Sequence, residues 1–260
     1  MTRDSGVIEV HAESVIAHDP GFLAHLALHR GLIVRRALLA GAIHGFLPVP
    51  VVDEALAGRV RAGLYTKLAA VRQVDLPPES AAILAEEKDG ASQLGFFAAA
   101  AVVAKFAGRK FMALLAAGRG AEEMAVTFQR AMLFDHYCAK LHVGGQITPV
   151  DAHRLRTCLA VKPKDPSLGP ARAAFRDGSR ILGRSLLEAP RWVSQRIAAL
   201  GERFVHSGGN PDVLDAFPED AAGENAWLDR AARAVEEAMA RAGNEHLTQQ
   251  IRAFEELWRG

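Results

Sequence analysis

The feature that most limits how this chain can fold is an apolar stretch that two prolines interrupt. Residues 40–52 contain no Asp, Glu, Lys or Arg, but Pro48 and Pro50 stand within them, and Asp53 and Glu54 end the stretch. A helix that spans a bilayer needs about 20 consecutive apolar residues, and proline in a helix interior breaks or kinks the helix. The sequence therefore predicts two helices that meet at a Pro-x-Pro break, with an apolar tip where they join.

Local signals place the ends of these two helices. Asp19 followed by Pro20 is typical of an N-cap and a first helical residue, so we expect one helix from there to about Phe46. A second helix is expected over about residues 52–72, with Asp53 as its cap, because the prolines of "VDLPPES" disfavour helical geometry in the residues before them. Three arginines in the first helix exclude a membrane span: Arg30, Arg35 and Arg36.

A second apolar stretch lies in "GASQLGFFAAAAVVAKFAGRK" and leads into an expected helix from Glu122 to Leu141. The segments "RAGLYTKLAA" from Arg61 and "RAMLFDHYCA" from Arg130 match at five of ten positions, 69 residues apart. Each segment precedes a turn with proline and a short expected helix, the second of which starts at the Thr148-Pro149 signal. A duplicated helical hairpin accounts for this order, and a chance match in an alanine-rich chain is the alternative.

The charge pattern changes at about residue 162. Residues 162–206 hold nine Lys or Arg and four Asp or Glu, a net of +5, whereas residues 207–260 hold five basic and eleven acidic residues, a net of −6. We therefore expect a pseudo-duplicated helical domain over residues 1–161 and a C-terminal helical region over residues 162–260, either separate or packed with the first as one domain. An arginine stands at every fourth position of the expected basic helix: Arg172, Arg176, Arg180 and Arg184.

The residue composition favours helices throughout the chain. Aromatic residues make up 7% of the sequence and alanine is very common. Alanine is the best helix former, whereas strands favour β-branched and aromatic residues. Two amphipathic patterns, over about residues 227–239 and 247–258, predict two helices near the C-terminus. The predicted fold class is all-α, a multi-helix bundle with an apolar helical hairpin.

One cluster has the spacing of a metal-ligand set or of a catalytic thiol. In "FDHYCAKLH", Asp135, Cys138 and His142 fall three and four residues apart on an expected helix. They could supply metal ligands or a thiolate beside an imidazole, and a buried, unreactive cysteine is the alternative. His25 and His29 are also four residues apart, but lack the Glu of a hydrolytic zinc helix. We predict no catalytic residue, no metal and no cofactor, with the Asp135 cluster as the residual candidate.

Net charge and cysteine content limit the expected partners and compartment. A formal net charge of +1 does not suit a general binder of polyanions, and few aromatic residues stand beside the arginines, so nucleic acid is not expected. The two cysteines form no C-x-x-C pair, and the first residues contain no apolar signal segment. We expect a cytoplasmic protein that can lie peripherally on the inner face of the membrane.

The hairpin sequence "GAIHGFLPVPVVDEALAGRVRAGLYTKLAAVRQVDLP" resembles that of bacterial helical proteins of the EcsC type and of a related uncharacterised family. In these families an Ala/Gly-rich helix breaks at Pro-x-Pro and a nearby Asp starts an amphipathic helix. Arg72-Gln73 stands where they commonly have Tyr-Gly. The resemblance implies a helical, often membrane-associated protein without an established reaction. The matching residues are Gly41, Gly45, Pro48, Pro50, Asp53, Asp75 and Leu76.

Three hypotheses about function follow. The first is a non-catalytic cytoplasmic scaffold or adaptor that associates peripherally with an anionic membrane surface. The second is a soluble helical module that binds a protein partner without membrane contact, and the third is a metal- or thiol-dependent enzyme. The tip can instead be buried as core against the second apolar helix. The expected membrane or partner contacts are Phe46, Leu47, Val49, Arg35, Arg36, Arg172, Arg176, Arg180 and Arg184.

Overall fold

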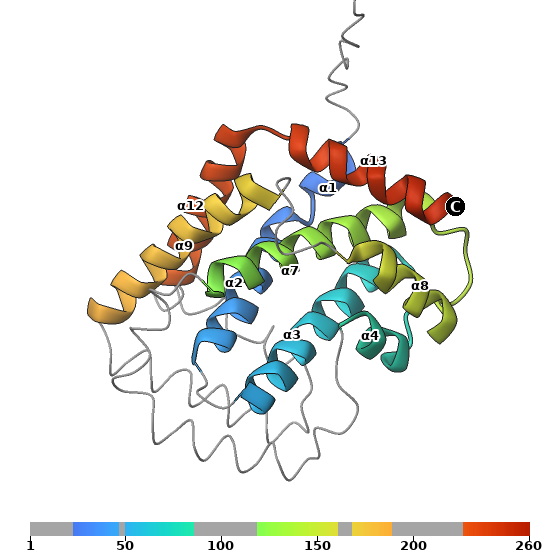
Figure 1. Cartoon of the computed structure of the whole chain (residues 1–260), viewed down its shortest axis with the longest axis horizontal. Coiled ribbons are helices and arrows are strands. Elements are labelled where there is room, and N and C mark those ends of the chain that lie inside the picture. Colours follow the sequence, from blue (N-terminus) through green and yellow to red (C-terminus); the bar gives the residue numbers. More distant parts are fainter. Residues whose placement is uncertain (1–22, 47–49, 86–118, 161–167, 189–225) are drawn as a thin grey trace, which may run out of the picture.

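The computed structural model describes residues 23–46, 50–85, 119–160, 168–188 and 226–260, and every structural statement below concerns these residues (Figure 1). They form helices and no strand, which confirms the predicted all-α, multi-helix fold class. The helices are α1 (Ala24–Ala27), α2 (Arg30–Phe46), α3 (Pro50–Val71), α4 (Pro78–Leu84), α7 (Arg119–His136), α8 (Pro149–Leu159), α9 (Gly169–Glu188), α12 (Ala226–Ala242) and α13 (Glu245–Arg259).

α2 and α3 form the predicted helical hairpin and pack against each other. Pro50 is the first residue of α3, where its missing N–H costs no hydrogen bond. The prediction that Asp53 caps this helix is wrong, because the helix already begins at Pro50 and Asp53 is its fourth residue. The single helix expected before the break is divided by a turn at residues 28 and 29 into α1 and α2. The expected N-cap at Asp19 lies outside the described residues.

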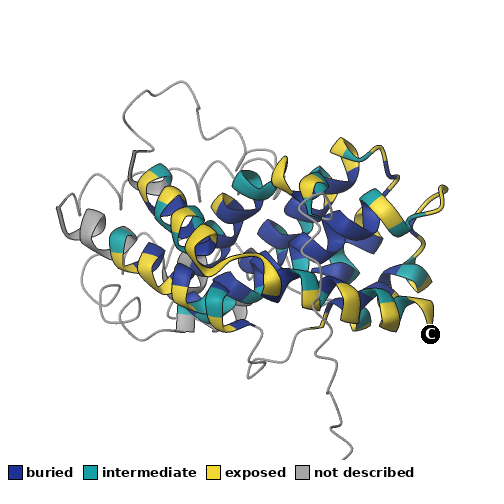
Figure 2. Ribbon diagram, turned by 90° about the horizontal axis from the view of Figure 1, so that it is seen from above, coloured by how far each residue is buried: buried dark blue, intermediate teal, exposed yellow. Residues whose placement is uncertain are grey.

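α7 lies in the middle of the bundle, and α2, α3 and α9 pack around it (Figure 1). Phe128 and Phe134 of α7 are fully buried. Their rings contact Phe175 of α9 and Tyr65 of α3, with centroid separations of 5.5 and 5.0 Å. Burying a side chain of this size stabilises a fold by about 1.5–3 kcal/mol. Figure 2 shows the result: buried residues lie where helices face one another, and exposed residues lie on the outside.

α3 and α7 carry the two similar segments and are in contact. Tyr65 and Phe134, which are equivalent positions in these segments, pack edge to face. Each helix leads through a non-helical segment to a short helix that begins at proline, α4 or α8, and these two helices also pack together. A parallel bridge between Asp75 and Gln146 joins the two segments. This common order agrees with a duplication, but the second apolar stretch lies outside the described residues, so the duplication stays a prediction.

The turn before α8 contains the glycines, and α8 the capped start, that the sequence predicts. Gly144 and Gly145 both have positive φ, at 80° and 83°, which glycine adopts without steric cost. The Thr148 side chain accepts a hydrogen bond from the backbone N–H of Asp151, and the Asp151 carboxylate accepts one from the backbone N–H of Thr148. This capping box satisfies two donors that the start of a helix leaves unpaired.

The C-terminal helices pack onto the N-terminal ones. α9 contacts α12 and α7, α12 also contacts α2, and α13 contacts α7 and α8. Arg35 of α2 pairs with Asp229 of α12 at 3.0 Å, and Arg172 of α9 pairs with Glu122 of α7 at 3.6 Å. One hydrophobic cluster includes side chains from both regions. In the described residues, the two predicted regions therefore share a core.

Candidate functional site

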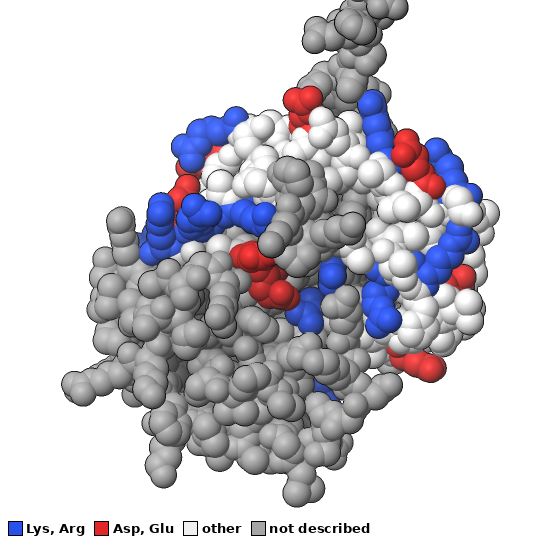
Figure 3. Space-filling model, in the orientation of Figure 1, with Lys and Arg blue, Asp and Glu red and all other residues white. Residues whose placement is uncertain are grey.

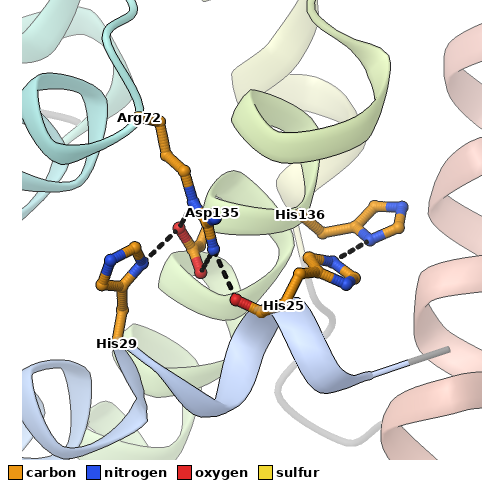
Figure 4. A network of polar contacts seen from close by, with 5 residues as sticks. All are labelled: His25, His29, Arg72, Asp135 and His136. Atoms are coloured by element: carbon orange, nitrogen blue, oxygen red, sulfur yellow. Dashed lines mark hydrogen bonds and ion pairs between the residues drawn. The ribbon is translucent and has the colours of Figure 1, made fainter. Parts of the chain in front are cut away.

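A fully buried carboxylate, Asp135 of α7, is the centre of a polar network (Figure 4). Arg72 donates to it from Nε to Oδ1 at 2.8 Å and from Nη2 to Oδ2 at 2.9 Å. His29 Nδ1 lies 3.0 Å from the same Oδ1. Arg72 Nη2 also donates to the backbone carbonyl of His25 at 2.6 Å. The network therefore connects α7 with the end of α3, the start of α2 and α1.

The backbone at the end of α3 positions Arg72 for this contact. Gln73 has a left-handed φ of 59°, and it is the one non-glycine residue of the described part with a positive φ. The next N–H, of Val74, donates back to the carbonyl of Ala69 at 2.9 Å. This is the hydrogen-bond pattern of a Schellman helix end, with Gln73 where glycine is usual. The hydrogen bonds that Arg72 donates to Asp135 raise the pKa of Arg72, so the guanidinium remains charged.

A second set of contacts runs from α1 through α7 to α13. His25 Nε2 lies 3.0 Å from His136 Nδ1, and His136 Nε2 lies 2.9 Å from Glu255 Oε1. Glu255 also accepts a hydrogen bond from Arg259 at 2.9 Å. An ionised carboxylate only accepts hydrogen bonds, so a neutral His136 donates from Nε2 to Glu255. Its Nδ1 then accepts from Nε2–H of His25, and both proton positions are assigned from these contacts.

Burial keeps these two histidines neutral near pH 7. Burial, followed by repulsion from His136, Lys140 and Arg72, lowers the pKa of His25 to about 4. Burial also lowers the pKa of His136, although the hydrogen bond with Glu255 opposes that shift. The site is therefore a pair of neutral imidazoles in series with a carboxylate, an arrangement that can take up protons as the pH falls.

The predicted Asp135–Cys138–His142 cluster has different partners in the structure. Asp135 is bonded to Arg72 and His29, as described. Cys138 is buried, and burial together with the Asp135 charge raises the pKa of its thiol, which disfavours the reactive thiolate. His142 lies 3.4 Å from the Tyr137 hydroxyl through Nδ1 and 3.1 Å from the Gly145 carbonyl through Nε2.

A π-helical turn explains why the spacing of this cluster misleads. α7 ends at His136 and continues as one π-helical turn, Tyr137–Leu141, closed by a hydrogen bond from the His142 N–H to the Tyr137 carbonyl at 2.9 Å. Beyond this turn His142 already has an extended backbone, so the helical spacing predicted for Asp135, Cys138 and His142 does not extend to His142. The described residues contain no group of three His, Cys, Asp or Glu side chains arranged to hold a metal ion.

The two N-terminal histidines also separate. His29 contacts Asp135, whereas His25 contacts His136, so their four-residue spacing does not produce a shared ligand site. The sequence alone does not identify Arg72, His136 or Glu255 as site residues. Arg72 does belong to the one departure from the EcsC-type pattern, Arg72-Gln73 in place of Tyr-Gly. For Glu255, which lies 119 residues from His136, no local signal exists.

The predicted contact arginines are distributed over several environments. Arg35 is half exposed and paired with Asp229, whereas Arg36 is buried at 2% exposure, which does not fit the surface contact predicted for it. Arg172 is paired with Glu122, and Arg176 is exposed. Arg180 is exposed and pairs with Asp177 at 3.2 Å, and the Arg184 side chain lies outside the description. On the face in Figure 3, described acidic and basic side chains are interspersed.

The structure describes the predicted tip of the hairpin only in part. Phe46, Pro50 and Asp53 lie in helices, and their side chains are outside the description. Leu47, Pro48 and Val49 lie outside the described residues altogether. No helix of the described part is both long enough and apolar enough to cross a membrane.

Comparison of the chain with protein-family models, with curated proteins and with solved structures gave no match. The similarity of the hairpin to EcsC-type proteins therefore remains a prediction.

Proposed function

We propose that the protein is a non-catalytic helical scaffold or adaptor that associates peripherally with an anionic membrane surface through the end of the α2–α3 hairpin. The distribution of charge along the hairpin is the observation that carries this proposal. Sixteen consecutive residues, Ala37 to Val52, contain no Asp, Glu, Lys or Arg, and they include the point where α2 ends and α3 begins. The uncharged residues are thus gathered at one end of a helical hairpin.

This end of the hairpin lies far from the polar network. α3 has 22 residues, so Arg72 at its end is about 33 Å from Pro50 at its start. On α2, His29 precedes the helix on the network side, and the helix is buried against α7 as far as Gly41. We call residues 42–52 the hairpin tip. Because the hairpin tip is distant from the network, a ligand can bind at the tip without disturbing the contacts by which the network holds the helices together.

Apolar side chains at the end of a hairpin can enter the boundary between headgroups and acyl chains without crossing the bilayer. Exposed arginines can add attraction to anionic lipid at a moderate strength that salt reduces. Of the predicted contact arginines, Arg35, Arg176 and Arg180 are exposed. The buried network supports a scaffold role, because its carboxylate at Asp135 is fully occupied by helix-to-helix contacts.

Vesicle flotation tests the proposal. The full chain is mixed with phosphatidylcholine vesicles, with or without phosphatidylglycerol, at low and at physiological salt. We expect the protein to float with the anionic vesicles, less so at higher salt. The double variant Leu47→Asp/Val49→Asp places two charges in the hairpin tip and is expected to reduce the bound fraction about tenfold or more, because charged side chains lose the apolar contribution to binding.

A matched control places the same charges elsewhere. Val143 and Val150 are exposed at 96% and 78%, in the turn before α8 and at the start of α8. Val143→Asp/Val150→Asp is therefore expected to fold and to float like the wild type. Absence of flotation at low salt, or equal loss in both double variants, contradicts the membrane role of the hairpin tip and leaves the protein-binding module as the function to pursue.

A further inference from the structure

We propose that the contact between His25 and His136 is an acid-sensitive latch that holds α1 against α7 and opens when both imidazoles are protonated. This inference does not depend on the proposed membrane role. It starts from the distance of 3.0 Å between His25 Nε2 and His136 Nδ1. A hydrogen bond at this distance needs one nitrogen with a proton and one with a lone pair. Two imidazolium rings have no lone pair, so they would present two N–H donors to each other.

The charged groups around the pair determine which protonation opens the latch. Glu255 of α13 faces His136 and stabilises a positive charge there. The first proton is therefore accommodated by His136, which keeps its contact with Glu255. His25 can still serve as an acceptor if its own proton moves to Nδ1. After the second proton binds, no tautomer preserves the hydrogen bond, because both facing nitrogens are then donors.

Other charges near the latch do not remove this effect. Lys140 and Arg72 are positive and disfavour a charge on His25. Asp135 favours one, but its carboxylate is already paired with Arg72 and bonded to His29. Cys138, in the π-helical turn after α7, is a buried thiol whose raised pKa keeps it neutral. Positive charge on His25 thus meets repulsion from His136, Lys140 and Arg72 that exceeds the attraction of Asp135.

α1 is the element that the latch can release. It is a helix of four residues, Ala24–Ala27, too short to be stable on its own. Besides the latch, contacts that hold it include the buried side chain of Leu26, the side chain of Leu23 just before the helix, and the hydrogen bond from Arg72 to the His25 carbonyl. Loss of the histidine contact therefore removes one of few attachments.

The direction and size of the effect follow from the lowered pKa of His25. In the open state His25 regains an ordinary pKa near 6.5, whereas in the closed state it is about 4. The closed state therefore has its full stability relative to the open state above pH 6.5, and this stability decreases as the pH falls toward 4. A fully shielded group would raise the opening constant about fifteenfold between pH 6.5 and 5. Because His25 is only partly buried, solvent screening reduces the expected change to about tenfold.

Hydrogen–deuterium exchange of the full chain at pH 7 and pH 5 tests the latch, after correction for the intrinsic exchange rates. In the wild type, peptides covering residues 23–29 are expected to exchange about tenfold faster at pH 5, while peptides of α9 and α12 change little. His25→Gln keeps a side-chain N–H that can donate to His136 but cannot be protonated in this range. We expect its exchange over residues 23–29 to be the same at both pH values.

Two further variants make the outcome decisive. His153→Gln, in an exposed position of α8, is the control and is expected to behave like the wild type. His136→Gln removes the other half of the pair and is expected to abolish the pH response as well, which provides the test if His25→Gln does not fold. The proposal is overturned if residues 23–29 of the wild type show no faster exchange at pH 5, or if the folded glutamine variants keep the wild-type response.

Discussion

Asp135 and Arg72 form a buried ion pair, and removing one partner of such a pair leaves an uncompensated charge in the core. Asp135 has no exposed surface and accepts two hydrogen bonds from the guanidinium. We expect Asp135→Asn to lower the free energy of unfolding by about 3–5 kcal/mol, measured by urea denaturation. Asp177→Asn, in the exposed pair with Arg180, is the control and is expected to cost about 0.5 kcal/mol or less.

The double variant Arg72→Met/Asp135→Leu separates the ion pair from the packing around it. Replacing both charges by apolar side chains leaves no buried charge, so we expect it to be more stable than Asp135→Asn alone. If the double variant is less stable than the wild type by the sum of the effects of Arg72→Met and Asp135→Leu, the two residues act independently and the network does not exist as described.

Gln73 adopts a backbone conformation that glycine adopts more easily. Its φ of 59° lies in the left-handed region, at the helix-end position where glycine predominates. We expect Gln73→Gly to raise the free energy of unfolding by up to about 1 kcal/mol, measured by urea denaturation. Gly144→Ala makes the reverse change at a φ of 80° with open space around the new Cβ, and a loss of about 1 kcal/mol is expected. A destabilised Gln73→Gly would show that the Gln73 side chain has a role of its own.

The close packing of α9 against α12 depends on a glycine. A Cβ added at Gly178 would lie 2.5 Å from Cγ2 of Val235, a side chain with little freedom to move. Alanine normally favours a helix interior over glycine by about 1 kcal/mol, but here we expect Gly178→Ala to lower the melting temperature, because overpacking costs about 1–3 kcal/mol.

Gly169, at the start of the same helix, is the control for that substitution. A Cβ added there meets nothing within 4 Å. Gly169→Ala is therefore expected to leave the melting temperature unchanged or to raise it. Equal effects of the two substitutions would contradict the packing of α9 on α12.

The ends and the amphipathic faces of several helices could be predicted from their own sequences. Other features of the helices could not. The end of α3, the capped start of α8 and the two amphipathic C-terminal helices follow from proline, glycine and hydrophobic spacing, all of which act over a few residues. The π-helical turn at Tyr137–Leu141 has no comparable local signal, and it changes which residues share a side. On either side of the break between α1 and α2, His25 and His29 contact α7, and these contacts with residues over 100 positions away have no local signal either.

The candidate site could likewise be predicted only where a local sequence signal exists. The spacing of charged and thiol residues singles out Asp135, but its partner Arg72 is 63 residues away and the partner of His136 is 119 residues away. Such pairs form only when the helices pack, so no periodicity within one helix contains them. The sequence predicts that this part of α7 is polar, whereas only the fold shows that its polar groups connect four other elements.

The stability of the molecule as a whole should depend on pH through its buried histidines. Burial lowers the pKa values of His25, His136 and His246 below the ordinary 6.5. A group that stays neutral in the fold and charges on unfolding destabilises the fold as the pH drops through this window. We expect the free energy of unfolding to be maximal above pH 6.5 and to fall by about 1–2 kcal/mol by pH 5, after allowance for partial solvent screening.

Urea denaturation at a series of pH values measures this dependence. The His25→Gln/His136→Gln double variant is expected to lose less stability over the same interval, because it has fewer groups that charge on unfolding. Constant or rising stability between pH 6.5 and 5 would contradict the neutral, buried state assigned to these histidines.

We propose two separate parts of the molecule, a polar network that holds the helices together and a hairpin tip that binds the membrane. Hydrogen–deuterium exchange of the full chain with and without anionic vesicles tests this division most directly. We predict slower exchange over the hairpin tip, residues 42–52, when vesicles are present, and unchanged exchange over residues 128–136 of α7. Protection that is absent from residues 42–52, or that is found instead at the network residues of α7, would contradict this division.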